Sequence, residues 1–139
     1  MTLFDFIKEA ETARRDKHEA IKRERKVLSP VLKDFTLIPE LWESFNKHLP
    51  PKNNTVEENM HRRRVFMLLV IRLYSPKALA GYNLDGKTRK YLAEQVGCSK
   101  SSLSHSFRNL TFQFMAVRSF REEAEGVIYS VLSEKGISL

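Results

Sequence analysis

KTRKYLAEQVGCSKSSLSHSFRNL, residues 87 to 110, is the stretch that decides the fold. Apolar residues at helical spacing on both sides of Gly97 predict two short helices joined by a turn, because glycine readily adopts the positive φ that a tight reversal needs. Ala93 is a small residue where the second helix is expected to cross the first. Ser99 is a suitable cap for the second helix. The predicted facing surfaces consist of Leu92, Val96, Leu103 and Phe107.

The same stretch closely resembles the helix-turn-helix of DNA-binding proteins, with Ala93 in the first helix and Gly97 at the turn. In that family the second helix enters the major groove, and its early residues meet base edges. The resemblance implies that the DNA-contacting residues of the second helix are Lys100, Ser101, Ser102, Ser104, His105 and Arg108. It also implies phosphate contacts at the start of the first helix, from Thr88, Arg89 and Lys90.

One position departs from the family pattern. Ser106 stands where the family usually has a branched aliphatic residue, and we expect Phe107 or Leu110 to fill that space instead. A helical hairpin with a purely structural role is the alternative interpretation of the segment. The polar first turn and a half of the second helix favours DNA binding, since a structural hairpin has no need of it.

The charge distribution also favours a polyanionic partner. The 139 residues carry a formal charge of +7, with a pI near 9.7. Residues 87–121 contain seven lysines and arginines against one glutamate, whereas residues 1–54 are nearly balanced. The basic excess therefore coincides with the predicted helix-turn-helix, as expected of a nucleic-acid binding surface.

The rest of the chain predicts further helices and no convincing strand. A capping box at Thr55 and Glu58 is expected to open an apolar core helix that runs to about Tyr74. A short helix over residues 76–80 is expected to follow, with Ser75 as its cap and Pro76 in its first turn. Residues 111–117 are expected to continue the second helix of the motif. A second capping box, Ser119 with Glu122, is expected to open a last helix that ends before Gly136. The predicted fold is all-α, a helical bundle containing a helix-turn-helix.

The N-terminal region predicts a helical arm. Leu3 to Leu28 contains no glycine or proline, and apolar residues such as Ile7 and Ile21 recur at helical spacing between charged residues. This helix could form a dimer arm or dock on the core through a few contacts. Pro39 opens a short helix whose Trp42 is expected to be a core anchor, and residues 50–54 read as a linker. We therefore divide the chain into a 1–54 arm and linker and a 55–139 core.

Several classes of site have no support in the sequence. The four histidines show no metal-ligand spacing with one another or with Cys98, and no catalytic or phosphate-loop motif occurs. We expect neither a cofactor nor enzymatic activity. The longest apolar run, residues 65–71, is too short to cross a membrane, and no secretory signal pattern begins the chain. Cytoplasmic localisation is the expectation. Arg62 to Arg64 fit either a second phosphate-binding patch or a solvated helix surface.

The function predicted from these features is sequence-specific binding of double-stranded DNA, with transcription regulation as its purpose. A homodimer or homo-oligomer formed through the N-terminal arm is expected. Residues 62–105 also resemble small helix-turn-helix proteins of bacterial mobile elements and phages, which implies a prokaryotic or phage origin. Two alternatives stay open: a packaging or assembly component similar to phage small terminase subunits, and a protein-interaction module that keeps the fold without binding DNA.

Overall fold

The computed structural model describes residues 1–15 and 28–139, and within those ranges the regular structure is entirely helical. The all-α prediction is therefore confirmed. None of the described helices is both long and apolar enough to span a membrane. The elements, in chain order, are α1 (Leu3–Arg15), η1 (Phe35–Leu37), α3 (Ile38–His48), α4 (Val56–Tyr74), η2 (Pro76–Ala80), α5 (Gly86–Val96), α6 (Lys100–Phe107), α7 (Leu110–Ala116) and α8 (Arg118–Lys135).

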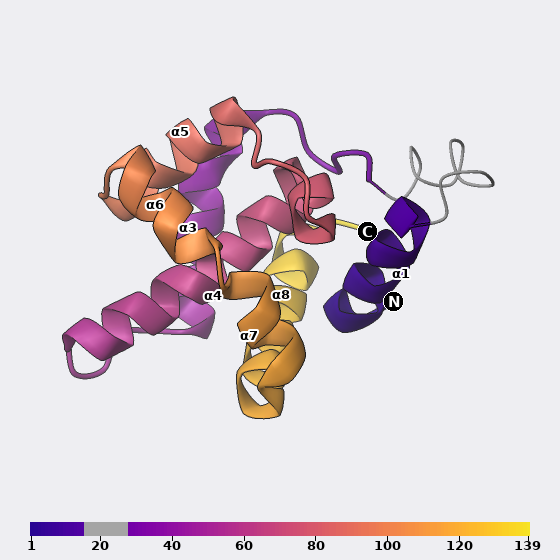
Figure 1. Cartoon of the computed structure of the whole chain (residues 1–139). Helices are drawn as coiled ribbons and strands as arrows, with labels where there is room; N and C mark the ends of the chain where they lie inside the picture. The colour runs from indigo at the N-terminus through magenta and orange to yellow at the C-terminus, as the bar shows by residue number, and fades with distance from the viewer. Residues whose placement is uncertain (16–27) are drawn as a thin grey trace.

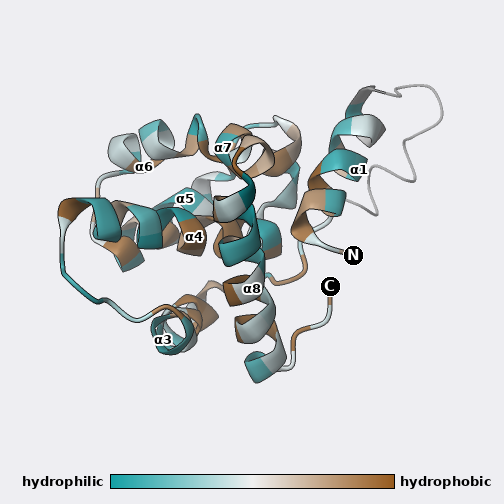
Figure 2. Cartoon of the chain, turned by 90° about the horizontal axis from the view of Figure 1, so that it is seen from below, coloured by the Kyte–Doolittle hydropathy of each residue, from teal (hydrophilic) through white to brown (hydrophobic). Residues whose placement is uncertain are grey.

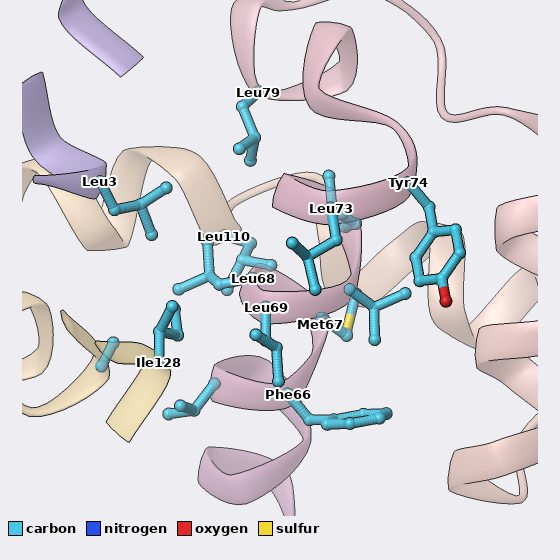
Figure 3. Packing of buried hydrophobic residues seen from close by; sticks show 14 of the residues in the cluster. Leu3, Phe66, Met67, Leu68, Leu69, Leu73, Tyr74, Leu79, Leu110 and Ile128 are labelled. Atoms are coloured by element: carbon cyan, nitrogen blue, oxygen red, sulfur yellow. The ribbon is translucent and has the colours of Figure 1, made fainter. Parts of the chain in front are cut away.

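Helix α4 forms the centre of the hydrophobic core, as its apolar run predicts. Every residue from Val65 to Tyr74 is buried, because other helices cover α4 on all sides of its second half. Figure 3 shows Leu69 and Leu73 of α4 among Leu3 of α1, Leu110 of α7 and Ile128 of α8. Segments that are distant in sequence thus meet on one helix, and the core they form fixes the position of each.

Only one of the two hydrogen bonds of the predicted capping box forms at the start of α4. The Thr55 hydroxyl accepts a hydrogen bond from the Glu58 amide at 3.2 Å. The Glu58 carboxylate, however, accepts the amides of Lys52 at 2.6 Å and Asn53 at 2.8 Å, and does not reach back to Thr55. These backbone bonds, with that from Asn53 the largest cause, hold the pKa of Glu58 below its ordinary value. The carboxylate therefore anchors the loop before α4 to the helix.

Two other predicted caps are wrong. The Ser75 side chain makes no cap bond to η2, and its Oγ accepts the Asp85 amide at 3.2 Å instead. The Ser119–Glu122 capping box does not form, because α8 already begins at Arg118, after Val117 in an extended conformation. Glu122 forms an ion pair with Arg118 at 2.9 Å. The other end of α8 follows the prediction, with Gly136 at a φ of +65°.

The first two long helices are not separate from the core. Leu3, Ile7 and Ala10 of α1, together with Phe45 of α3, belong to the same buried cluster as the side chains of α4 and α8. The Arg72 guanidinium of α4 lies 3.7 Å from the centre of the Phe6 ring. Residues 3–10 of the expected arm are therefore part of the hydrophobic core, and so are the apolar residues of α3, because both helices pack on α4 and α8. The predicted continuation of the first helix, including Ile21, lies outside the described residues, and Leu28 is in a turn.

Trp42 is a core anchor, as predicted. Its ring packs edge-on against Phe66 with the ring centres 4.8 Å apart, and it stacks on Phe45. The guanidinium of Arg62 lies over the Trp42 ring and donates to the Leu49 carbonyl at 2.9 Å and to the Asn46 side chain. Arg62 is thus buried and serves to hold α3 against α4. It is not available as part of a phosphate-binding patch.

Glu134 connects the end of α8 to α3, and we expect Glu134→Gln to make the protein less stable at neutral pH. Hydrogen bonds from Ser44 (2.7 Å), His48 (2.7 Å) and Lys47 (3.1 Å) lower the pKa of Glu134 from 4.5 to about 2. Because the folded-state pKa lies below the unfolded one, this stabilisation is complete above about pH 4.5 and is lost as the pH falls toward about 2.

Urea midpoints measured against pH test this expectation. The wild-type and Glu134→Gln curves should differ at neutral pH and converge as the acid range is entered. A difference that persists unchanged down to the lowest pH would show that the carboxylate charge does not contribute.

Candidate nucleic-acid interface

Helices α5 and α6 form a tight pair joined by residues 97–99, as the sequence predicts. Gly97 adopts a φ of +71°, and its amide donates to the Ala93 carbonyl, so α5 ends in a left-handed turn. Ala93 is buried, which fits a small residue at the crossing. The Ser99 hydroxyl accepts the Ser102 amide at 3.0 Å and begins α6. We call residues 86–107 the α5–α6 unit.

The α5–α6 unit is fastened to the core from several sides. Leu92 of α5 and Leu103 of α6 are fully buried in the common cluster. The Phe35 ring stacks between Tyr74 of α4 and Tyr91 of α5, with ring centres 5.0 Å apart in both pairs. The unit therefore has a fixed orientation, and its outer surface is set by packing rather than by its own two helices.

The outer surface of α6 is polar and open. Lys100, Ser101, Ser102 and His105 are exposed, as is Arg108 directly after the helix. Both views place α6 at the periphery of the molecule, and most of its ribbon is hydrophilic to neutral in colour (Figures 1 and 2). Ser104 is half-buried. The structure thus leaves five of the six predicted contact residues exposed, along α6 and directly after it.

The start of α5 differs from the prediction. Thr88 is fully buried, and its hydroxyl and amide both bind the Asp85 carboxylate, at 3.2 Å and 3.1 Å. Thr88 cannot contact a phosphate in this arrangement, because Asp85 caps the helix and draws the threonine inward. Lys90 is exposed, with its ammonium 5.5 Å from the centre of the Tyr91 ring.

Arg89 is half-buried and reaches toward α6. Its Nη1 donates a long hydrogen bond of 3.5 Å to the Ser104 hydroxyl, and its Nε is buried with no hydrogen-bond partner. Arg89 therefore bridges the two helices of the unit. Its role as a DNA-phosphate ligand stays a prediction, because Arg89 is half-buried and lines an open cleft beside α6.

The predicted continuation of α6 through residues 111–117 is helical as far as Ala116, but it is not continuous with α6. The chain turns at Arg108 and Asn109, and α7 begins at Leu110. Leu110 is fully buried, while Phe107 is half-buried against the core. These two residues supply the apolar packing that Ser106 does not, as expected. The break limits α6 to eight residues, so its exposed end is short.

Asp85 is a positioning residue that the predicted site did not include. Its carboxylate caps α5 and orients Thr88, while its amide donates to Ser75 after α4. The signal that could have revealed it is an aspartate directly before the first helical residue, because aspartate is among the residues preferred at a helix N-cap.

The described residues contain no group of three or more histidine, cysteine, aspartate or glutamate side chains able to hold a metal ion. Cys98 is half-buried against the core, as expected of a packing residue. Comparisons of the chain with protein-family models, with curated proteins and with solved structures find no match. The candidate interface is therefore defined by its own geometry and charge.

Proposed function

We propose that the chain binds double-stranded DNA in a sequence-specific manner, with the α5–α6 unit acting as a helix-turn-helix. The observation that carries the proposal is the polar, exposed start of α6, held at the periphery by a rigidly packed α5. A helix end of this kind can enter the major groove and present donors and acceptors to base edges.

Each contact has a chemical role in this proposal. Lys100 and Arg108 donate to guanine or to phosphate, and they flank a helix surface with no acidic residue. The hydroxyls of Ser101 and Ser102, together with the His105 ring, contact bases or the backbone. Lys90, exposed near the start of α5, offers a phosphate contact that positions the unit without reading sequence.

Transcription regulation is the purpose that we propose for this binding, in the cytoplasm of a prokaryotic or phage-infected cell. A regulator of this kind acts as a dimer on paired half-sites. Because Leu3, Ile7 and Ala10 pack inside the chain, a dimer contact would use other residues than the first part of the expected arm.

Selection of bound sequences from random duplex DNA tests the proposal. We expect the recovered pool to share a motif, with two copies one helical turn or a multiple apart if the protein binds as a dimer. Binding to the selected duplex should weaken steeply with salt, since each neutralised phosphate releases counterions. Recovery of an unenriched pool, together with binding that is absent at low salt, would refute DNA binding and leave a protein-interaction role.

A further inference from the structure

An open cleft of about 1030 Å³ lies between α1 and the α5–α6 unit. One wall is formed by Glu11 and Arg14 of α1, and the floor by the segment from Ala78 to Leu84. The opposite wall consists of Arg89, Ser104, Phe107, Arg108 and Thr111. The volume is near the upper end of the usual range for small-molecule sites.

Positive charge dominates the cleft. Arg14, Arg89 and Arg108 line it from three different elements, with Glu11 as the acidic residue of the lining. Bringing three guanidinium groups to one concave surface is unfavourable unless an anion compensates them. Guanidinium is also the group best matched to the paired oxygens of phosphates and carboxylates.

Arg14 is held in place by three consecutive residues of the cleft floor, Ala80, Gly81 and Tyr82. Its Nη1 donates to the Ala80 carbonyl at 3.0 Å, and its guanidinium lies 4.8 Å from the centre of the Tyr82 ring. Gly81 next to it has a φ of +94°, and a Cβ at this position would overlap the Arg14 guanidinium. The glycine thus serves both the turn and the close approach of the arginine.

Arg89 has hydrogen-bonding capacity left over on the other wall. The bond from Arg89 Nη1 to Ser104 is long, and the buried Nε–H has no acceptor. An anion in the cleft can accept from the guanidinium N–H groups that the long Ser104 bond leaves weakly satisfied, and hydrogen bonds to charged donors are stronger than those to neutral ones. Phe107 and Leu84 add apolar surface beside the charged groups.

From these observations we infer that the cleft is a binding site for a small organic anion that carries phosphate or carboxylate groups beside an apolar part. Arg108 lines the cleft and is also one of the proposed DNA contacts, so a small anion would share this one residue with a bound duplex, while Arg14 and Arg89 belong to the cleft alone. Such a ligand contacts α1 and the α6–α7 turn together, so its binding constrains the position of α6. An effect on DNA affinity rests on the proposed function, whereas ligand binding itself does not.

Calorimetric titration of the full chain with inorganic phosphate, pyrophosphate and citrate, in the absence of DNA and at matched ionic strength, tests the site. We expect saturable binding of at least one probe at millimolar concentrations or below. Preference for pyrophosphate or for citrate distinguishes a phosphate ligand from a carboxylate ligand. Arg14→Gln, whose side chain is exposed, and Arg89→Gln should each weaken binding by about tenfold or more.

Arg118→Gln is the matched control, because Arg118 is an exposed arginine of α8 outside the cleft. It should bind the probes as the wild type does. The inference is overturned if no probe binds saturably, or if Arg118→Gln loses as much affinity as the two cleft variants. Arg14→Gln keeps the test decisive should Arg89→Gln fail to fold.

Discussion

Lys100→Ala combined with Arg108→Ala is expected to weaken binding to the selected duplex by about 100-fold at moderate salt. Lys100 is exposed at the start of α6 and Arg108 directly after its end, and in the proposed complex each would supply a positive charge to a base edge or a phosphate. Loss of one such contact costs about tenfold or more, and the two sites are far enough apart along the helix to add. The dependence of affinity on salt should become shallower by about two counterions if both residues contact phosphate.

A control variant with the same change in net charge separates contact from general attraction. Lys8→Ala with Lys135→Ala removes two exposed lysines, one on α1 and one at the end of α8. We expect this variant to lose little affinity and to recover the wild-type motif from random DNA. Equal losses in the two double variants would mean that α6 is not the surface that reads DNA.

Phe66→Ala is expected to lower the free energy of unfolding by about 3–5 kcal/mol. Phe66 is fully buried on α4, and its ring packs against Trp42 and Phe45 at centre distances of 4.8 Å and 5.3 Å. The truncation removes these ring contacts and leaves a cavity where α3 meets α4, which the surrounding helices can fill only in part. A loss of this size is a large share of the stability of a typical domain.

Phe112→Ala is the control for this experiment, since it makes the same chemical change at a ring that is 72% exposed. We expect Phe112→Ala to alter the free energy of unfolding by no more than about 0.5 kcal/mol. Chemical denaturation with an unchanged slope for each variant measures the difference. Similar midpoints for Phe66→Ala and Phe112→Ala would show that the α3–α4 contact is not a main source of stability.

Helix boundaries that depend on a few adjacent residues were predictable from the sequence. Gly97 and Gly136 end their helices because glycine tolerates a positive φ, and Ser99 and Thr55 begin theirs through a side-chain oxygen that accepts a nearby amide. The Ser119 prediction shows the limit of such patterns. A capping box is only one way to start a helix. Here α7 ends at Ala116 and only the extended Val117 separates it from α8, so α8 begins before Ser119.

The direction in which polar side chains point was not predictable from local pattern. Thr88 and Arg62 both lie on helices beside basic residues, yet Asp85 draws the first inward, while Leu49 and Asn46 bind the second. Each partner is recognisable only once the fold has brought it near. The sequence likewise suggested an arm for the segment that forms α1, because its few apolar residues stand among charged ones. Their partners in the core lie far away in the sequence.

The amino-acid sequence alone determined where most helices begin and end, which faces are apolar and where the basic charge collects, since these depend on neighbours within one or two turns. Tertiary structure decided that α1 and α3 complete the core, that Arg89 faces α6, and that Arg14 meets the α5–α6 unit across a cleft. These outcomes depend on contacts between residues at least 15 positions apart, beyond the few turns over which local patterns act. Their energies arise only when the whole chain is packed.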